Sequence, residues 1–175
     1  MTIHITGLAE HHDRAGFDCD EPALNEFLRR LARQQAERGF NRTYVAVEGE
    51  GSEILGFYSL SAGGVEFQHW PTGLRLPRYP VPVARIGRLA VDQRRQGSGV
   101  GRLLLRHALQ VSAALAEQIG LYAVVVDAKH AEAAAFYVRF GFQPFQDGGL
   151  GLLLPLATIR QAGLPAPERG NETSP

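Results

Sequence analysis

Hydrophobic positions in the first part of the chain change their spacing twice, which separates strands from a helix. Alternating apolar and polar residues predict strands over residues 3–6, 43–48 and 53–62. Between the first two strands, Leu24, Phe27, Leu28 and Leu31 recur at helical spacing. A helix is therefore expected from Asp20, whose side chain can cap it, to Gly39.

The stretch Val65–Val83 breaks the alternating pattern. It contains four prolines and the single tryptophan, Trp70. Proline removes a backbone donor and fixes φ, so such a density argues against a helix or a central strand. Gly63-Gly64 is expected to end the preceding strand, and the stretch is predicted to be a long extended loop with a functional purpose.

Helices and strands alternate in the rest of the chain. The pattern predicts strands over 85–92, 121–127, 142–145 and 150–156 and helices over 103–119 and 131–140. A strand–helix–strand unit implies a parallel pair, whereas the early hairpin implies antiparallel pairing. We therefore expect one α/β domain over residues 1–157, with a mixed sheet flanked by helices on both faces, and a flexible tail over 158–175.

Composition narrows the class of protein. The 175 residues suit one domain, and 45% hydrophobic with 21% charged residues suits a folded core. No apolar run is long enough to span a membrane, and the N-terminus lacks the features of a signal peptide. Cys19 is the single cysteine, and no Cys/His cluster suggests a metal. A cytoplasmic protein without a membrane association or a metal is expected.

The 18 basic and 18 acidic residues are unevenly distributed. The segment from Arg75 to Arg106 contains eight arginines and one acid, Asp92, which gives +8 − 1 = +7. Two interpretations remain open at this point, a solvated arginine-rich face and a surface that binds an anion such as a phosphate.

A glycine-rich loop favours the anion site. Gly97, Gly99 and Gly101 stand between a predicted strand and a predicted helix, where backbone N–H groups and the helix N-terminus can bind an anion. Arg102-Leu103 follows where a P-loop needs Lys-Ser/Thr, and the preceding residues lack the repeated strand–helix units of a dinucleotide fold. The loop is thus a phosphate cradle of another kind.

Two motifs resemble those of the GCN5-related N-acetyltransferases (GNAT). Gln96-x-x-Gly99-x-Gly101 is similar to the family's acetyl-CoA pyrophosphate loop, and the helix with Gly141-Phe142 after it resembles the second signature. Further stretches resemble the TacT-like toxin branch of type II toxin–antitoxin systems, although Asp20 stands where that branch usually has glycine. These stretches begin at Phe17, Asn41, Gly56, Leu76 and Gly87.

The resemblance implies a GNAT fold, acetyl-CoA as co-substrate and a set of binding residues. Backbone groups would hold the pantetheine arm and the loop would hold the pyrophosphate, with Arg94 and Arg95 close enough to assist. The implied acetyl-CoA-binding residues are Leu89, Ala90, Val91, Gln96, Gly97, Ser98, Gly99, Val100, Gly101 and Arg102. Such toxins acetylate the α-amine of aminoacyl-tRNA, and a ribbon–helix–helix antitoxin and a homodimer are the implied partners.

Amine acetylation needs a proton donor for the leaving thiolate. Tyr137 is the candidate general acid, because a phenol with pKa near 10 is protonated at neutral pH. The alternative is an aromatic side chain that anchors its helix beside Phe136 and Phe140. No Asp or Glu occurs over residues 67–91 or 93–116, so a carboxylate base is lacking. That favours an α-amine, which is already partly neutral, over a lysine.

The arginines around the proline-rich loop are candidate RNA contacts. Arg75, Arg78 and Arg85 are expected to bind phosphates of a tRNA acceptor stem. Trp70 and Tyr79 are candidates to stack on a terminal base, and for Trp70 the alternative is that it covers the core beneath the loop. Two alternatives remain: a GNAT enzyme for a small amine or a protein N-terminus, and a non-catalytic acyl-CoA-binding module. Arg29, Arg30 and Arg33 form an alternative basic surface.

Overall fold

A computed structural model describes residues 2–164 of the protein. Its strands are β1 (Ile3–Gly7), β2 (Arg42–Glu48), β3 (Gly56–Val65), β4 (Val81–Val91), β5 (Ala123–Asp127), β6 (Gln143–Pro144) and β7 (Gly151–Pro155). They form one sheet in the order β1-β2-β3-β4-β5-β7-β6. The pairing of β4 with β5 is parallel, whereas β1–β2, β2–β3, β5–β7 and β6–β7 are antiparallel, which confirms the predicted mixed sheet.

Two compact units share this chain. The first comprises residues 2–60 and 88–110, and the second comprises residues 61–87 and 111–164. The helices are α1 (Pro22–Glu26), α2 (Ala32–Glu37), α3 (Val100–Leu115), α4 (Ala131–Arg139) and α5 (Leu156–Gln161). No helix among residues 2–164 is long and apolar enough to cross a membrane.

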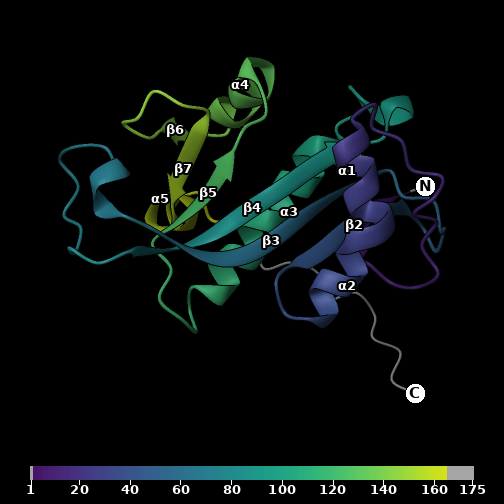
Figure 1. Ribbon diagram of the computed structural model, residues 1–175, viewed down its shortest axis with the longest axis horizontal. Coiled ribbons are helices and arrows are strands. Elements are labelled where there is room, and N and C mark those ends of the chain that lie inside the picture. Colours follow the sequence, from purple (N-terminus) through teal and green to yellow (C-terminus); the bar gives the residue numbers. More distant parts are fainter. Residues whose placement is uncertain (1, 165–175) are drawn as a thin grey trace. The chain divides into compact units, whose positions relative to one another are not determined.

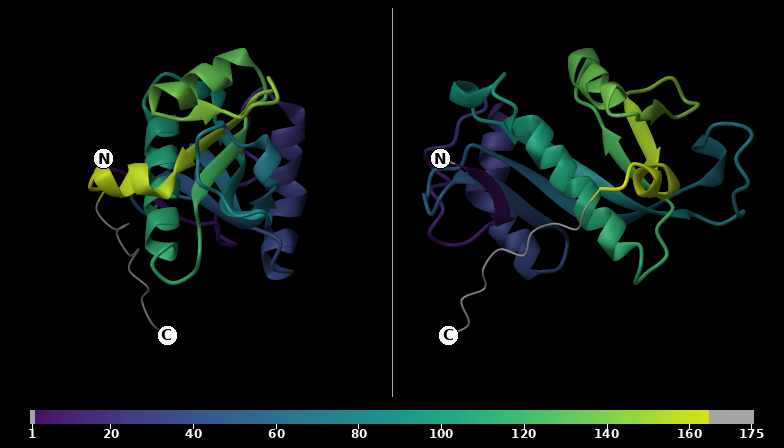
Figure 2. Two further views of the ribbon diagram at one scale, coloured as in Figure 1. Left: turned by 90° about the vertical axis from the view of Figure 1, so that its left-hand side faces the viewer. Right: turned by 180° about the vertical axis from the view of Figure 1, so that it is seen from behind.

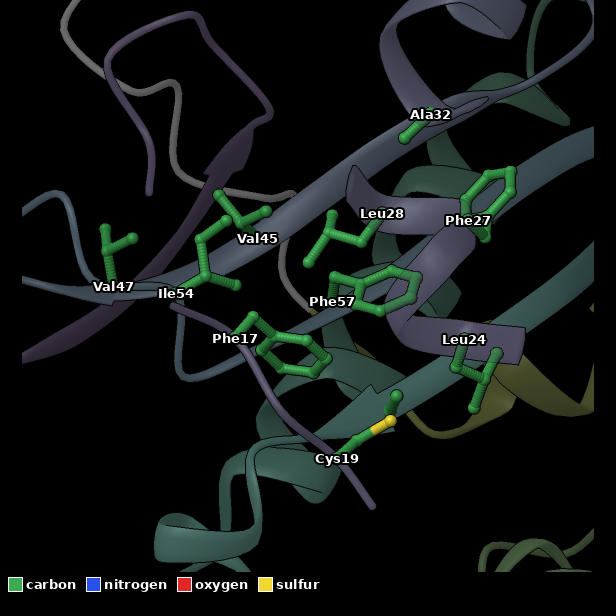
Figure 3. Packing of buried hydrophobic residues seen from close by; sticks show 11 residues of the cluster. Phe17, Cys19, Leu24, Phe27, Leu28, Ala32, Val45, Val47, Ile54 and Phe57 are labelled. Atoms are coloured by element: carbon green, nitrogen blue, oxygen red, sulfur yellow. The ribbon is translucent and has the colours of Figure 1, made fainter. Parts of the chain in front are cut away.

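Residues on β3 alternate between two faces of the first unit. Phe57 packs edge-on against Phe17 (centroids 5.4 Å apart) and stacks with Phe27 (6.1 Å), in a core cluster under α1 and α2 (Figure 3). The next side chain, Tyr58, joins its hydroxyl to Nδ1 of His107 on α3 at 2.7 Å. The helices thus cover both faces of this unit's strands (Figures 1 and 2).

The predicted helix over residues 20–39 is present but not uniform. A π-helical turn, η1 (Phe27–Leu31), separates α1 from α2. The prediction that Asp20 caps the helix is wrong. Glu21 occupies the N-cap position of α1, and its side chain makes no capping hydrogen bond. Asp20 instead has φ +65°, a left-handed conformation that favours glycine. The turn expected of a glycine is therefore kept by an aspartate.

The second unit has its core under the proline-rich segment. Trp70 is buried, and its ring meets Tyr122 and Phe145 edge-on at 5.3 and 5.2 Å. Its indole N–H donates to the carbonyl of Val65 at 3.2 Å. A short 3₁₀ turn, η2 (Phe67–His69), precedes it. The segment therefore acts as a cover for one apolar cluster of this unit.

Two expectations about this segment are wrong. Gly63-Gly64 does not end β3, which continues to Val65. A Cβ at Gly64 would lie 3.1 Å from the Cβ of Pro80, so this glycine permits a close approach. The segment also ends earlier than predicted, because β4 begins at Val81 and includes Pro82, whose carbonyl accepts a hydrogen bond from Tyr122 N–H.

Other boundaries move by a few residues. The long helix α3 begins at Val100, three residues before the predicted start, and ends at Leu115. Leu156 and Ile159 are buried on α5, so the predicted flexible tail is wrong at least over residues 158–161. Residues 165–175 of that tail lie outside the described residues.

Candidate functional site

The glycine loop joins β4 to α3 in the first unit. Gly97 and Gly99 adopt φ values of +78° and +92°, and a Cβ at either would meet no heavy atom within 4 Å. Among the described residues, no acceptor is recorded for the N–H groups of Gly97, Gly99 and Gly101. Together with the start of the 16-residue α3, these donors make a cradle that fits the pyrophosphate of acetyl-CoA.

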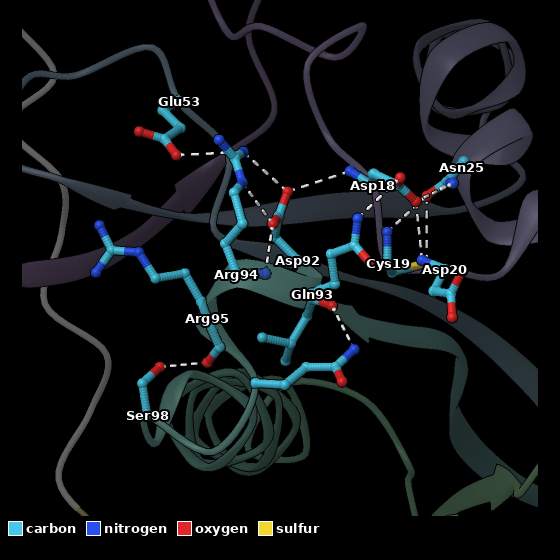
Figure 4. A network of polar contacts seen from close by, with 12 residues as sticks. Asp18, Cys19, Asp20, Asn25, Glu53, Asp92, Gln93, Arg94, Arg95 and Ser98 are labelled. Atoms are coloured by element: carbon cyan, nitrogen blue, oxygen red, sulfur yellow. Dashed lines mark hydrogen bonds and ion pairs between the residues drawn. The ribbon is translucent and has the colours of Figure 1, made fainter.

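Asp92 holds the entrance of this loop. Its Oδ1 accepts hydrogen bonds from N–H and Nε of Arg94, both at 2.9 Å, and its Oδ2 accepts from Asp18 N–H at 3.1 Å (Figure 4). The side chain is 1% exposed. The hydrogen bond from the Arg94 side chain outweighs burial and lowers the pKa of Asp92 to about 2. Asp92 therefore caps the loop as an ionised group.

Side chains of the loop mostly bind the protein itself. Arg94 pairs with Asp92 and Glu53, and Arg95 pairs with Glu48 at 3.1 Å. Gln96 Nε2 donates to the carbonyl of Val91 at 3.3 Å, and the Ser98 hydroxyl donates to the carbonyl of Arg95. Arg102 lies exposed in the first turn of α3. Arg94 and Arg95 thus shape the loop, and the backbone N–H groups of its glycines supply the free donors.

Replacing Asp92 by asparagine should lower the stability of the protein. The variant keeps the shape but loses the charge that faces Arg94, so we expect unfolding at pH 7 to cost less by on the order of 2 kcal/mol. The folded pKa of Asp92 lies below its unfolded value, so its contribution is present above about pH 4 and disappears as the pH falls toward 2.

Denaturant melts of Asp92→Asn and wild type between pH 7 and pH 2.5 measure this contribution. The difference between the two proteins should shrink below about pH 4. Glu50→Gln, which removes a carboxylate from an exposed turn, is the matched control and should change stability little. A variant as stable as wild type at pH 7 would show that the carboxylate makes no net contribution.

The strand before the loop offers backbone groups to an extended ligand. The register of β4 with β5 covers Val83–Ile86, whereas β4 continues to Val91. Leu89, Ala90 and Val91 lie beyond that register, and Ala90 belongs to the core cluster of the first unit. This arrangement fits the predicted strand-like pairing with pantetheine, while the Ala90 side chain packs in the core.

Tyr137 lies near the end of α4 in the second unit. It is 5% exposed, and its ring meets Phe136 and Phe142 edge-on at 5.2 and 5.6 Å. Burial raises the pKa of the phenol, which therefore remains protonated at neutral pH. Its hydroxyl has no hydrogen-bond partner among the described residues, and the hydroxyl oxygen is not one of the polar atoms that are both fully buried and unpaired. Both anchoring and proton donation are compatible with this setting.

The three arginines predicted to contact tRNA differ in their surroundings. Arg75 and Arg78 are exposed on the proline-rich segment, and no carboxylate among the described residues pairs with them. Arg85 pairs with Asp127 at 2.8 Å. Tyr79 is 63% exposed and open to stacking, whereas Trp70 is 2% exposed. The interpretation of Trp70 as a stacking platform is wrong, because its ring fills the core.

Other candidate groups have structural surroundings. Cys19 is buried, and its thiol contacts Oδ1 of Asn25 at 3.2 Å; burial raises the pKa of that thiol, as suits a small core residue. On the first helical segment, Arg30 pairs with Glu26 and Arg33 pairs with Glu37. No group of three or more metal-ligating side chains is placed to hold an ion among residues 2–164.

Two contacts in the first unit had no signal in the sequence. His107, which bonds Tyr58, has its pKa lowered to about 4 by burial and is neutral at pH 7. The Arg88 guanidinium carbon lies 3.7 Å from the ring centroid of Phe27. Sixty residues lie between Phe27 and Arg88 in the chain, so their contact depends on the π-helical turn packing against β4.

Known proteins match this chain over most of its length. The family described as "Acetyltransferase (GNAT) domain" matches residues 39–144. A "tRNA-acetylating toxin" of Mycobacterium tuberculosis is 37% identical over 155 residues, which cover 87% of this chain and 92% of that protein. A "Probable toxin TacT" of Sinorhizobium fredii is 33% identical over 159 residues, which cover 85% and 88%.

Solved structures agree with these relatives. A tyrosine-to-phenylalanine mutant of KacT has TM-score 0.87 at 31% identity and covers 93% of this chain and 99% of its own. AtaT complexed with acetyl-methionyl-tRNAfMet has TM-score 0.86 at 28% identity, with the same coverage. A tyrosine-to-phenylalanine mutant of AtaT, bound to the C-terminus of the antitoxin AtaR and acetyl-CoA, has TM-score 0.78 at 27% identity, covering 93% and 98%.

Proposed function

Because this chain belongs to the GNAT acetyltransferase family, in the branch of TacT-like toxins, we propose that it transfers the acetyl group of acetyl-CoA to the α-amine of aminoacyl-tRNA and so blocks translation. The observation that carries the donor half is the glycine loop, whose N–H groups at Gly97, Gly99 and Gly101 point to an anionic ligand. The stretch Leu89–Val91, which lies beyond the register of β4 with β5, would hold the pantetheine.

The hydrogen bonds of Asp92 support the second half of the proposal, that the acceptor is an α-amine. Asp92 is the single acid between residues 67 and 116, and it is occupied by Arg94 and Asp18. A site without a free carboxylate base suits an amine that is already partly neutral, as the α-amine of an esterified amino acid is. Leu89, Ala90 and Val91 also carry no base. Water would take the proton from the amine.

Tyr137 would act as the general acid. The nitrogen of the amine attacks the thioester carbonyl, the carbon–sulfur bond breaks, and the phenol proton goes to the departing thiolate of coenzyme A. Burial keeps this phenol protonated at neutral pH. Tyrosine-to-phenylalanine mutants of KacT and AtaT are among the similar structures, which supports a special role for a tyrosine in this branch.

The proposed partners follow the same relatives. The AtaT mutant bound to the C-terminus of the antitoxin AtaR supports an antitoxin for this chain, which we propose to be of the ribbon–helix–helix type. A homodimer and a cytoplasmic location complete the proposal. Incubating the purified protein with labelled acetyl-CoA and charged or uncharged tRNA tests it. Label should enter only the charged tRNA, and transfer to small amines alone would overturn the acceptor.

The exposed arginines Arg75 and Arg78 are expected to bind tRNA phosphates. Replacing both by glutamine should raise KM for charged tRNA and reduce the slope of log affinity against log salt by about 1.4–1.8, because two fewer counterions are released. KM for acetyl-CoA should not change. The control is Arg30→Gln with Arg33→Gln, which removes equal charge from acid-paired positions. Equal effects of both double variants would show that net charge alone governs binding.

A further inference from the structure

A cation stands at the edge of the core of the first unit. Arg88, on β4, lies with its guanidinium carbon 3.7 Å from the ring centroid of Phe27. Phe27 is 2% exposed and stacks in turn with Phe57, so the ring beneath the guanidinium is fixed. Ala90, two residues farther along β4, belongs to the same cluster as Phe27, which agrees with the alternation of the strand. The core thus sets the orientation of the Arg88 head group.

This cation lacks an anion of its own. Within residues 2–164, no carboxylate and no hydrogen-bond acceptor is recorded for Arg88. Its neighbours differ, since Arg85, Arg94 and Arg95 each pair with an acid. Arg88 is half-buried, and its loss of water lowers the pKa of the guanidinium. An unpaired, partly desolvated charge is costly to the fold, and a ligand anion would offset that cost.

The stacking leaves the hydrogen-bond donors of Arg88 available. The contact with the ring is made by the guanidinium carbon over the ring face, and the five N–H groups of a guanidinium form a planar fork that suits two oxygens of a phosphate. The immobilised head group has lost most of its rotamer freedom before a ligand arrives, so binding costs less entropy. The arrangement is suited to one phosphate group in a defined direction.

The position of Arg88 along β4 separates this site from the pyrophosphate loop. A strand rises about 3.3 Å per residue, so Arg88 lies about 10 Å before Val91, and the loop follows beyond that. With the pyrophosphate on the loop and pantetheine along Leu89–Val91, Arg88 lies toward the thioester end, where the acceptor amine must come. In aminoacyl-tRNA, the phosphate nearest that amine is the one that joins the last two nucleotides.

We propose that Arg88, held on Phe27, binds the phosphodiester between the last two nucleotides of the acceptor strand and thereby positions the aminoacylated ribose. The inference rests on the proposed function. It adds a residue that binds the acceptor. Arg88 would contact the 3′ end of the tRNA, whereas the exposed arginines of the proline-rich segment would contact the stem.

Two small acceptors test this role. An aminoacylated cytidylyl-adenosine contains the phosphodiester, whereas a 3′-aminoacyl-adenosine lacks it. Wild type should use the dinucleotide about 10–100-fold more efficiently in kcat/KM, the range expected for a charged hydrogen bond. Arg88→Gln should lose this preference, with unchanged activity on the aminoacyl-adenosine and unchanged KM for acetyl-CoA. Arg38→Gln is the matched control, because Arg38 lies 5.0 Å from the exposed ring of Phe40, and should keep the preference.

Other results would contradict either the role assigned to Arg88 or the proposed function. A preference retained by Arg88→Gln would make Arg88 a structural brace, and a raised KM for acetyl-CoA with both acceptors would assign it to coenzyme A. Arg88→Lys keeps the charge without the planar fork and should show a smaller preference than wild type; it serves as the second variant if Arg88→Gln does not fold. Failure of wild type to acetylate any charged tRNA would instead overturn the proposed function itself.

Discussion

Tyr137→Phe is expected to lower kcat by about 10²–10⁴-fold, the usual contribution of a general acid. The substitution keeps the ring that packs on Phe136 and Phe142 and removes only the hydroxyl, for which the described residues provide no recorded partner. The melting temperature and the affinity for acetyl-CoA should therefore stay close to those of wild type. Single-turnover rates with charged tRNA measure the effect on the chemical step.

A matched variant separates catalysis from packing. Tyr122 also contributes a ring to a core cluster of the second unit, so Tyr122→Phe tests the loss of a tyrosine hydroxyl outside the proposed chemistry. It should leave kcat within about twofold, well below the loss expected of a missing acid. If Tyr137→Phe behaves in the same way, the residue anchors its helix and the acid is another group or water.

The pH profile gives a second test of the same assignment. Because burial raises the pKa of Tyr137 above its ordinary value, the phenol stays protonated through neutral pH and adds no titration there. The rate should rise with pH as the α-amine of the acceptor loses its proton, in wild type and in Tyr137→Phe alike. A falling limb near pH 7 in wild type alone would contradict the assignment.

Gly99→Asp is expected to weaken acetyl-CoA binding by at least about 100-fold. The carboxylate would enter the open space beside the loop, where it repels the pyrophosphate, and the φ of +92° disfavours any side chain. Isothermal titration calorimetry measures the affinity. Gly73 is a matched control, because it has φ +90° and equally open space but lies in the second unit's proline-rich segment.

Gly73→Asp should bear the same backbone strain and the same charge while acetyl-CoA affinity stays within a few fold. Circular dichroism and thermal melts of both variants measure the strain directly. Unchanged affinity in Gly99→Asp would show that the pyrophosphate binds elsewhere. Equal losses in both variants would mean that a general defect of folding, and not the loop, explains the result.

The sequence predicted what depends on local pattern. The strand–loop–helix around Gly97 and Gly99 was predicted because its glycines, its apolar run and the following helix are contiguous. The family resemblance added the acetyl donor and the toxin branch, and the relatives confirm both. Local signals therefore located the part of the candidate site that binds the acetyl donor.

The errors all come from tertiary context. Gly63-Gly64 looks like a strand end, but the sheet uses Gly64 where Pro80 approaches closely. Trp70 looks like a surface aromatic in a loop, but Tyr122 and Phe145 form a core around it. The pairing of Arg88 with Phe27 joins distant segments. None of these contacts leaves a periodic trace in the chain.

The clamps at the entrance of the glycine loop limit how far that loop can be transplanted. Its shape depends on Asp18, Glu48 and Glu53, which belong to distant upstream segments. The Asp18 carboxylate accepts a hydrogen bond from Gln93, and Glu48 and Glu53 pair with Arg95 and Arg94. Grafting residues 92–101 alone into another acetyltransferase would carry over the glycines without their supports. We therefore expect substitutions in the loop and in these three acids to be correlated among related sequences, although the positions are far apart in the chain.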